Sequence, residues 1–118
     1  MQPDKLRSLV LEALDELKGV DIICLDVGDV SGFTDYMVIA SGTSSRHVKS
    51  LADNVVKRSR EAGVKALGVE GETTGDWILV DLGDVVTHIM LPDTRAFYNI
   101  EKLWSVAGNG ESGVVSHK

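Results

Sequence analysis

Hydrophobic and polar residues alternate along two neighbouring stretches, Asp76–Leu82 and Val85–Leu91, and this alternation predicts two β-strands. Only Gly83-Asp84 separates them. A glycine at the first central position of a two-residue loop is typical of a type II′ hairpin, because that position needs a positive φ. A loop this short fixes the register, so we expect Trp77 to lie opposite Met90.

The hairpin register sorts the side chains onto two faces of a sheet, because successive side chains in a strand point to opposite sides. The first face is aliphatic apart from one threonine and consists of Ile78, Val80, Leu82, Val85, Thr87, Ile89 and Leu91. We expect helices to cover it. The second face consists of Trp77, Leu79, Asp81, Val86, His88 and Met90. Because it mixes apolar groups with a carboxylate and an imidazole, it is either a shallow core or a docking surface.

The periodicity of the rest of the chain predicts helices and strands around this hairpin. Apolar residues three and four positions apart predict one helix over Pro3–Lys18 and a second that follows Ser41–Ser45 and stops at Gly63. Further strands are predicted at Val20–Val27, Asp35–Ala40 and Lys65–Val69. We expect the stretch from Asp35 to Val69 to form a βαβ unit with parallel strands.

The C-terminal part of the chain predicts a closing helix and a tail. The helix is expected to begin near Pro92, with Asp93 as its N-cap. The apolar residues that we expect it to bury are Phe97, Ile100, Leu103 and Trp104. Ser105–Lys118 is rich in Gly and Ser and predicts a disordered tail. The sequence thus predicts an α/β fold over residues 1–104, with a mixed five-stranded sheet and helices mainly on one face, and a tail over residues 105–118.

Charge and cysteine content narrow the choice of partner and compartment. The 118 residues include 12 basic and 18 acidic side chains, a net charge of −6. Nucleic-acid binding needs clustered Lys and Arg, so we expect no direct sequence-specific nucleic-acid contact and a basic protein as partner. The single Cys24 fits a reducing compartment. No stretch has the length of a membrane span or the pattern of a signal peptide, so we expect a cytoplasmic protein with no membrane partner.

Residues that could carry chemistry have simpler explanations. Ser41–His47 lies where a strand turns into a helix, a place that can bind anions, but Ser and Thr are also the ordinary N-cap residues. His47 and His88 have no partner at a metal-ligand spacing, so we expect His47 to be solvated and His88 to pack beside Leu79. No strand carries two acids two residues apart, the arrangement that holds Mg²⁺ for phosphoryl or nucleotidyl transfer. We therefore predict no catalytic residue, no metal and no cofactor.

Several segments in order resemble a known family. They are GTSSRHV (Gly42–Val48), LGVEGE (Leu67–Glu72), DWILVDLGDVVTHIM (Asp76–Met90), and Tyr98 followed by EKLW (Glu101–Trp104). The chain from about Leu6 to Trp104 resembles the Iojap family, whose bacterial members are ribosomal silencing factors. This resemblance implies a fold related to nucleotidyltransferases but without their catalytic carboxylate pair. It also implies binding to the large ribosomal subunit through universal large-subunit protein fourteen, a steric block of small-subunit joining, and repression of translation when nutrients are scarce.

The second face of the hairpin is the expected docking surface. Burying Asp81 without a partner would be costly, which favours a surface covered by another protein or by a second copy of the chain in a homodimer. Trp77 is expected to be a binding anchor there. Two alternatives to the silencing function stay open: a large-subunit assembly or scaffold protein without silencing activity, and a nucleotidyltransferase-type enzyme.

Overall fold

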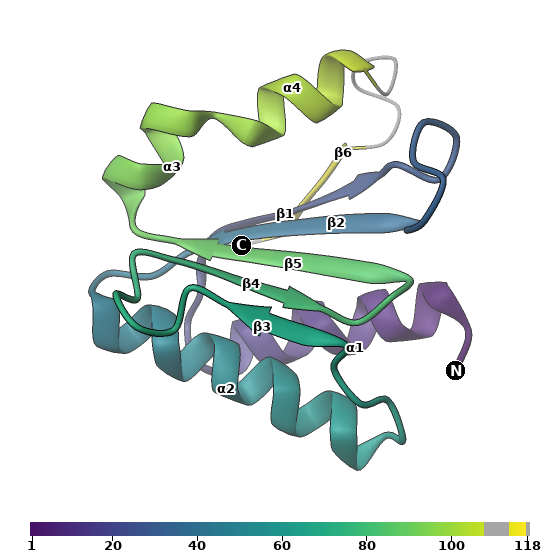
Figure 1. Cartoon of the computed structure of the whole chain (residues 1–118), viewed down its shortest axis with the longest axis horizontal. Coiled ribbons are helices and arrows are strands. Elements are labelled where there is room, and N and C mark those ends of the chain that lie inside the picture. The colour runs from purple at the N-terminus through teal and green to yellow at the C-terminus, as the bar shows by residue number, and fades with distance from the viewer. Residues whose placement is uncertain (108–113, 118) are drawn as a thin grey trace.

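A mixed β-sheet lies between two layers of helices in the computed structural model, which describes residues 1–107 and 114–117 (Figure 1). The elements in chain order are α1 (Pro3–Glu16), β1 (Val20–Asp26), β2 (Tyr36–Ser41), α2 (Ser45–Glu61), β3 (Gly68–Glu70), β4 (Trp77–Asp81), β5 (Val85–Met90), α3 (Pro92–Tyr98), α4 (Ile100–Ala107) and β6 (Val114–His117). The strand order is β3-β4-β5-β2-β1-β6. The α/β class and the mixed sheet are confirmed.

The predicted hairpin forms β4 and β5 with the expected register. Trp77 pairs with Met90, and Leu79 pairs with His88. Gly83 has a φ of +87°, and the N–H of Leu82 donates to the carbonyl oxygen of Val85 (3.0 Å). The positive φ is the reason that glycine is needed at the first position of this turn.

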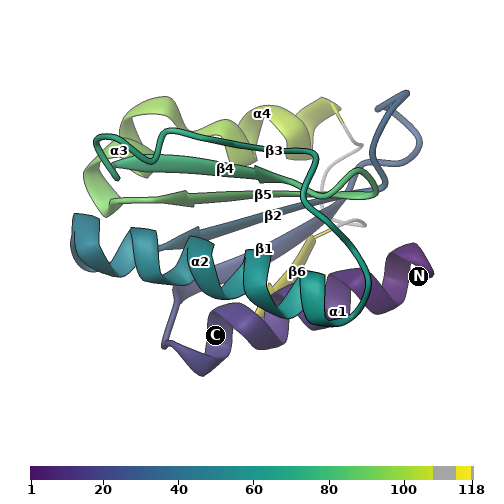
Figure 2. The same cartoon turned by 60° about the horizontal axis from the view of Figure 1, so that its bottom comes forward.

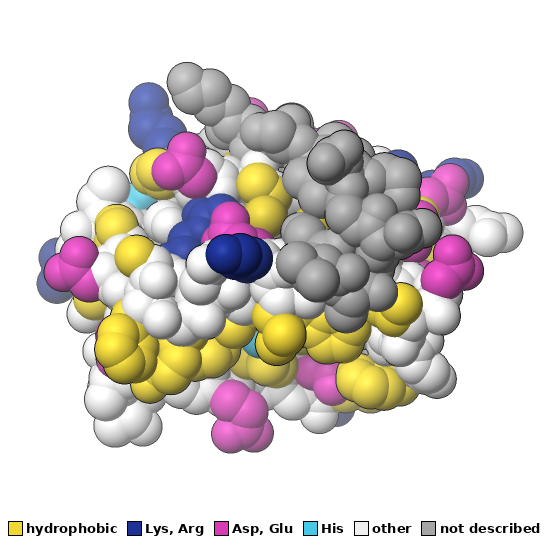
Figure 3. Space-filling model, turned by 90° about the horizontal axis from the view of Figure 1, so that it is seen from above, with side chains coloured by type: hydrophobic (Ala, Val, Ile, Leu, Met, Phe, Trp, Pro, Cys, Tyr) yellow, Lys and Arg dark blue, Asp and Glu magenta, His cyan; other side chains and the backbone are white. Residues whose placement is uncertain are grey.

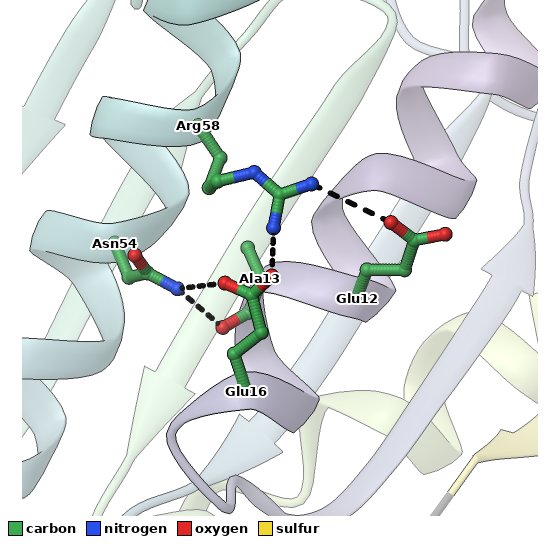
Figure 4. Close-up of polar contacts among 5 residues, drawn as sticks. All are labelled: Glu12, Ala13, Glu16, Asn54 and Arg58. Atoms are coloured by element: carbon green, nitrogen blue, oxygen red, sulfur yellow. Dashed lines mark hydrogen bonds and ion pairs between the residues drawn. The ribbon is translucent and has the colours of Figure 1, made fainter.

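Helices α1 and α2 lie side by side on the first face of the sheet, as Figure 2 shows. The aliphatic residues predicted for this face are buried together with Leu14 of α1 and Leu51 of α2, except Leu91, which is half-buried and packs against them. The two helices are also tied by polar contacts (Figure 4). Arg58 pairs with Glu12 and Glu16, while Nδ2 of Asn54 donates to the carbonyl oxygen of Ala13 (2.8 Å). This layer is therefore held both by apolar packing and by a polar seam.

The predicted βαβ unit is wrong in its strand pairing. β2 runs parallel to β5, whereas β3 pairs antiparallel with β4 at the edge of the sheet. Burial explains this choice. Every residue of β5 is buried, so that strand takes a central position, while none of the three residues of β3 is fully buried. A strand with little apolar surface to bury is suited to an edge.

The predicted closing helix is two helices, α3 and α4, that cross the second face of the sheet (Figure 1). Asn99 separates them with a left-handed φ of 49°, and the N-cap of α3 is Leu91 rather than Asp93. Ile100 and Trp104 pack on the sheet as expected. Phe97 and Leu103, which were expected to be buried, are 81% and 68% exposed.

The C-terminal segment also differs from the expectation of disorder. α4 continues through Ala107, and Val114–His117 forms β6, which pairs antiparallel with β1. Adjacent valines favour a strand, and β1 offers a free edge. Among the described residues, the sheet therefore has six strands, with helices on both faces. The rest of the predicted tail, residues 108–113 and 118, lies outside the described residues.

Candidate protein interface

The second face of the hairpin is partly a core and partly a surface. Its six predicted residues lie on the same side of the sheet, as the confirmed register requires. Met90 is fully buried, and His88 and Val86 are 7% and 9% exposed. Trp77, Leu79 and Asp81, all on β4, are half-buried. The surface that this face offers is therefore carried by β4, while β5 lies deeper.

A second hydrophobic cluster closes over the deeper part of this face. Its buried members are Leu25, Val27, Met37, Ile39 and Met90, and Ile23, Trp77, Ile100 and Trp104 pack around them. Met90 belongs to this core and has no surface to contact a partner. Trp77 touches the same core from its rim, so the indole serves both the core and the surface.

Trp77 is held in place by a hydrogen bond to His88. The indole Nε1–H donates to Nδ1 of His88 (3.0 Å), and the ring centroids lie 5.9 Å apart. Burial lowers the pKa of His88 to about 4, so the imidazole is neutral near pH 7 and free to accept at Nδ1. His88 packs beside Leu79 across the strand pair, as the sequence predicted.

A chain of aromatic rings extends from Trp77 to the solvent. The ring centroids of Tyr98 and Trp77 lie 4.8 Å apart. The ring of Phe97 meets that of Tyr98 edge-on, with centroids 4.9 Å apart. Tyr98 is 55% exposed and Phe97 81%. We call Trp77, Tyr98 and Phe97 the aromatic ledge. Figure 3 shows hydrophobic side chains in a band across this side of the molecule, with acidic side chains along its border.

Sequence reasoning missed Phe97 and Leu103 as surface residues because it treated the closing segment as one helix. A usable signal was present. Phe97 and Tyr98 are adjacent, so their side chains point in directions about 100° apart around the helix axis, and one can face the sheet while the other faces the solvent.

Arg95 fixes the α3–α4 arm that carries the ledge. Its side chain is 10% exposed, and its guanidinium contacts both carboxylate oxygens of Glu101 (2.7 and 3.2 Å). Its Nη1 also donates to Oγ of Ser41 at the end of β2 (2.9 Å). Because one guanidinium joins α3, α4 and the sheet, the position of the ledge is set before any partner binds. Nothing in the spacing of Arg95 and Glu101 indicated this clamp.

The strand-to-helix turn at Ser41–His47 is a capping structure. Oγ of Ser44 accepts from the N–H of His47 (3.1 Å), and Nδ1 of His47 accepts from the N–H of Thr43 (2.9 Å). His47 keeps the partial solvent exposure expected of it, and its Nε2 also contacts the carbonyl oxygen of Leu17 at the end of α1 (2.7 Å). Two N–H donors of this turn are thus already paired within the chain.

Cys24 and the possible metal ligands are the remaining groups that could carry chemistry. Cys24 is buried, and burial raises the pKa of its thiol to about 11, so it is not a reactive nucleophile. Within residues 1–107 and 114–117, no three His, Cys, Asp or Glu side chains gather to hold a metal ion. In the same part of the chain, every helix is too short or too polar to cross a membrane.

Comparisons with known proteins point to the ribosome. A family model described as "Ribosomal silencing factor during starvation" (RsfS) matches residues 1–117. The ribosomal silencing factor RsfS of Haemophilus influenzae is 48% identical over 85% of this chain and 98% of its own length. That of Chromobacterium violaceum is 46% identical over 88% of this chain and 85% of its own. A mouse protein named "Mitochondrial assembly of ribosomal large subunit protein 1" is 36% identical over 83% of this chain and 44% of its own length.

Solved structures support the same relationship. A crystal structure of a Chromobacterium violaceum protein matches with a TM-score of 0.88 and 44% identity, over 95% of this chain and 90% of that one. A crystal structure from Bacillus halodurans matches with a TM-score of 0.79 and 36% identity, over 86% of this chain and 94% of that one. The fold described above is therefore shared with these relatives.

Proposed function

The chain belongs to the RsfS family of ribosomal silencing factors, and we propose that it docks on universal large-subunit protein fourteen and blocks joining of the small subunit. Translation would then fall when nutrients are scarce. The action belongs in the cytoplasm, where the subunits meet. The observation that carries the proposal is the aromatic ledge, which is exposed and yet fixed in position.

The ledge has the composition and rigidity of a binding hot spot. Trp and Tyr dominate hot spots because they bury a large area and lose little conformational entropy on binding. Here Trp77 is fixed by a hydrogen bond to His88 and packed against the ring of Tyr98, so little conformational entropy remains to be lost when a partner binds. Leu79 and Asp81 lie beside it on β4. The proposed contact surface is thus the predicted face, extended by Tyr98 and Phe97 and with Met90 as its buried support.

Charge favours a ribosomal protein as the partner. The net charge of this chain is −6, and proteins of the ribosome are basic because they bind RNA. Opposite charges raise the association rate and suppress wrong partners. A second copy of this acidic chain gains no such attraction, which makes the homodimer the weaker candidate for covering the ledge.

Steric exclusion is the proposed mechanism, with no chemical step. The chain measures about 34 × 34 × 23 Å along its principal axes. A body of this size on the intersubunit face would keep the two subunits apart. A transferase activity is not expected, because none of the strands in residues 1–107 and 114–117 carries two carboxylates two residues apart to hold the metal ions of that chemistry.

A role in assembly of the large subunit is the second candidate. The name of the mouse relative, which is 36% identical to this chain, favours it. Both functions need binding to the large subunit, but only silencing requires that bound protein prevents joining.

Co-sedimentation with separated subunits tests the binding step. We expect the protein to travel with large subunits and not with small ones. Large subunits that lack universal large-subunit protein fourteen should not retain it. Equal binding to subunits with and without that protein would contradict the proposed partner.

A further inference from the structure

His88 lies at the centre of the second sheet face. Its neighbours across the two adjoining strands are Leu79 on β4 and Ile39 on β2. The residue is only 7% exposed, so its imidazole forms part of the floor of the proposed docking surface.

The hydrogen bond from Trp77 determines which nitrogen of His88 carries the proton. An indole N–H can only donate, so Nδ1 of His88 accepts in the 3.0 Å contact and bears no proton. A neutral imidazole must then carry its proton on Nε2. The indole thereby holds His88 in the Nε2–H tautomer.

The Nε2–H group lacks a partner among the described residues. No acceptor in residues 1–104 contacts it, and His88 has one hydrogen bond there, the one at Nδ1. In this part of the chain, Oγ1 of Thr87 is the only fully buried side-chain polar atom without a hydrogen bond. Nε2 of His88 is not such an atom, and His88 keeps 7% of its surface exposed. Nε2 therefore lies at the solvent-accessible surface. A purely apolar partner would cover this donor and leave it unpaired, which is unfavourable.

We propose that Nε2–H of His88 is a binding donor of the docking surface, and that the protein partner places a neutral carbonyl oxygen against it. This inference rests on the proposed function, because it assumes that the ledge is the contact surface. The oxygen is expected to be neutral because Asp81 lies on the same face, two residues along β4 from Leu79, and the chain carries a net charge of −6. A partner carboxylate would be repelled there.

Two substitutions separate the two nitrogen atoms of His88. His88→Asn places an amide oxygen near the position of Nδ1, where it still accepts from Trp77, but it has no group that reaches the position of Nε2. His88→Leu removes both functions. Ser8→Ala on α1, in the opposite helix layer, is the matched control. Each variant is tested as the full chain against isolated universal large-subunit protein fourteen, with the indole N–H signal of Trp77 followed by NMR.

We expect His88→Asn to weaken binding about tenfold, the factor that corresponds to one hydrogen bond, with the Trp77 indole signal in its wild-type position. His88→Leu should weaken binding further and shift that signal. Wild-type affinity of His88→Asn would overturn the inference, and so would a free-protein NMR spectrum with the His88 proton on Nδ1. A doubly protonated His88 in the complex would show a carboxylate partner and contradict the neutral oxygen.

Trp77→Ala distinguishes failure of this inference from failure of the proposed function. If Trp77→Ala loses binding while His88→Asn does not, the docking surface stands and only the donor role of His88 is overturned. If Trp77→Ala binds like the wild type, the docking surface itself lies elsewhere.

Discussion

The rings of Trp77 and Tyr98 pack at a tilt of 49° with centroids 4.8 Å apart, although the two residues come from different layers of the fold. Trp77 begins β4 in the sheet, and Tyr98 ends α3 in the arm above it. This contact joins the hairpin to the arm and builds one surface from two elements. Predictions about binding therefore concern both elements.

Trp77→Ala is expected to weaken binding to large subunits by about thirtyfold or more, since truncation of a hot-spot tryptophan costs about 2 kcal/mol or more. Folding stability should also fall, because Trp77 packs at the rim of the second core. We expect that loss to be smaller than the ~3–5 kcal/mol typical of a fully buried tryptophan. Urea unfolding and co-sedimentation of the same sample measure both effects. A large loss of stability with normal binding by the folded fraction would make Trp77 a core residue only.

Phe97→Ala separates binding from stability more cleanly. Phe97 is 81% exposed, so its removal should leave the melting temperature unchanged and still weaken binding several-fold. The matched control is Phe33→Ala, because Phe33 is 78% exposed in the loop between β1 and β2. The ledge would be the wrong surface if both variants bound equally well.

Sequence patterns predicted the parts of the fold that local spacing determines and missed the parts that depend on packing across the whole molecule. The hairpin was predictable because a two-residue loop leaves one register. The place of β3 was not, because the choice between parallel pairing with β2 and antiparallel pairing with β4 depends on burial across the whole sheet. Phe97 was misplaced because helical spacing does not reveal the break at Asn99. The predicted face contained Trp77 and His88, but their hydrogen bond depends on side-chain geometry that the sequence does not record.

Stability should fall in mild acid through His88. Its pKa is lowered from 6.5 to about 4 by burial, so the unfolded chain binds a proton at higher pH than the folded chain does. The contribution of neutral His88 to the free energy of unfolding is complete above about pH 6.5 and is lost as the pH falls toward 4. This amounts to about 2 kcal/mol between pH 7 and pH 5. Urea unfolding at both values measures it, and His88→Asn, which keeps every carboxylate, should lack this part of the pH dependence. An equal loss in both proteins would assign the effect to other groups.

The clamp between Arg95 and Glu101 should stabilise the arm. A double-mutant cycle with Arg95→Met and Glu101→Gln is expected to give a coupling energy of about 1–2 kcal/mol, because the guanidinium is largely buried and contacts both carboxylate oxygens. The more exposed pair of Arg58 and Glu12 should give a smaller coupling energy, because solvent screens it. Equal coupling in the two pairs would show that burial of Arg95 contributes nothing.

Salt should act mainly on the association rate. The net charge of −6 attracts a basic partner before contact, and added salt screens this attraction over distances of about 8–10 Å. Stopped-flow kinetics should show slower association at higher salt with little change in dissociation. Kinetics that do not respond to salt would mean that the acidic side chains lie away from the contact.

Subunit joining in the presence of the purified protein tests the central claim most directly. Large subunits are incubated with the wild type or with Trp77→Ala, small subunits are added, and joined particles are quantified by sedimentation. We predict that the wild type strongly reduces the joined fraction and that Trp77→Ala leaves it near the level without added protein. Normal joining while the wild-type protein remains bound to the large subunit would contradict silencing by steric exclusion and favour the assembly role.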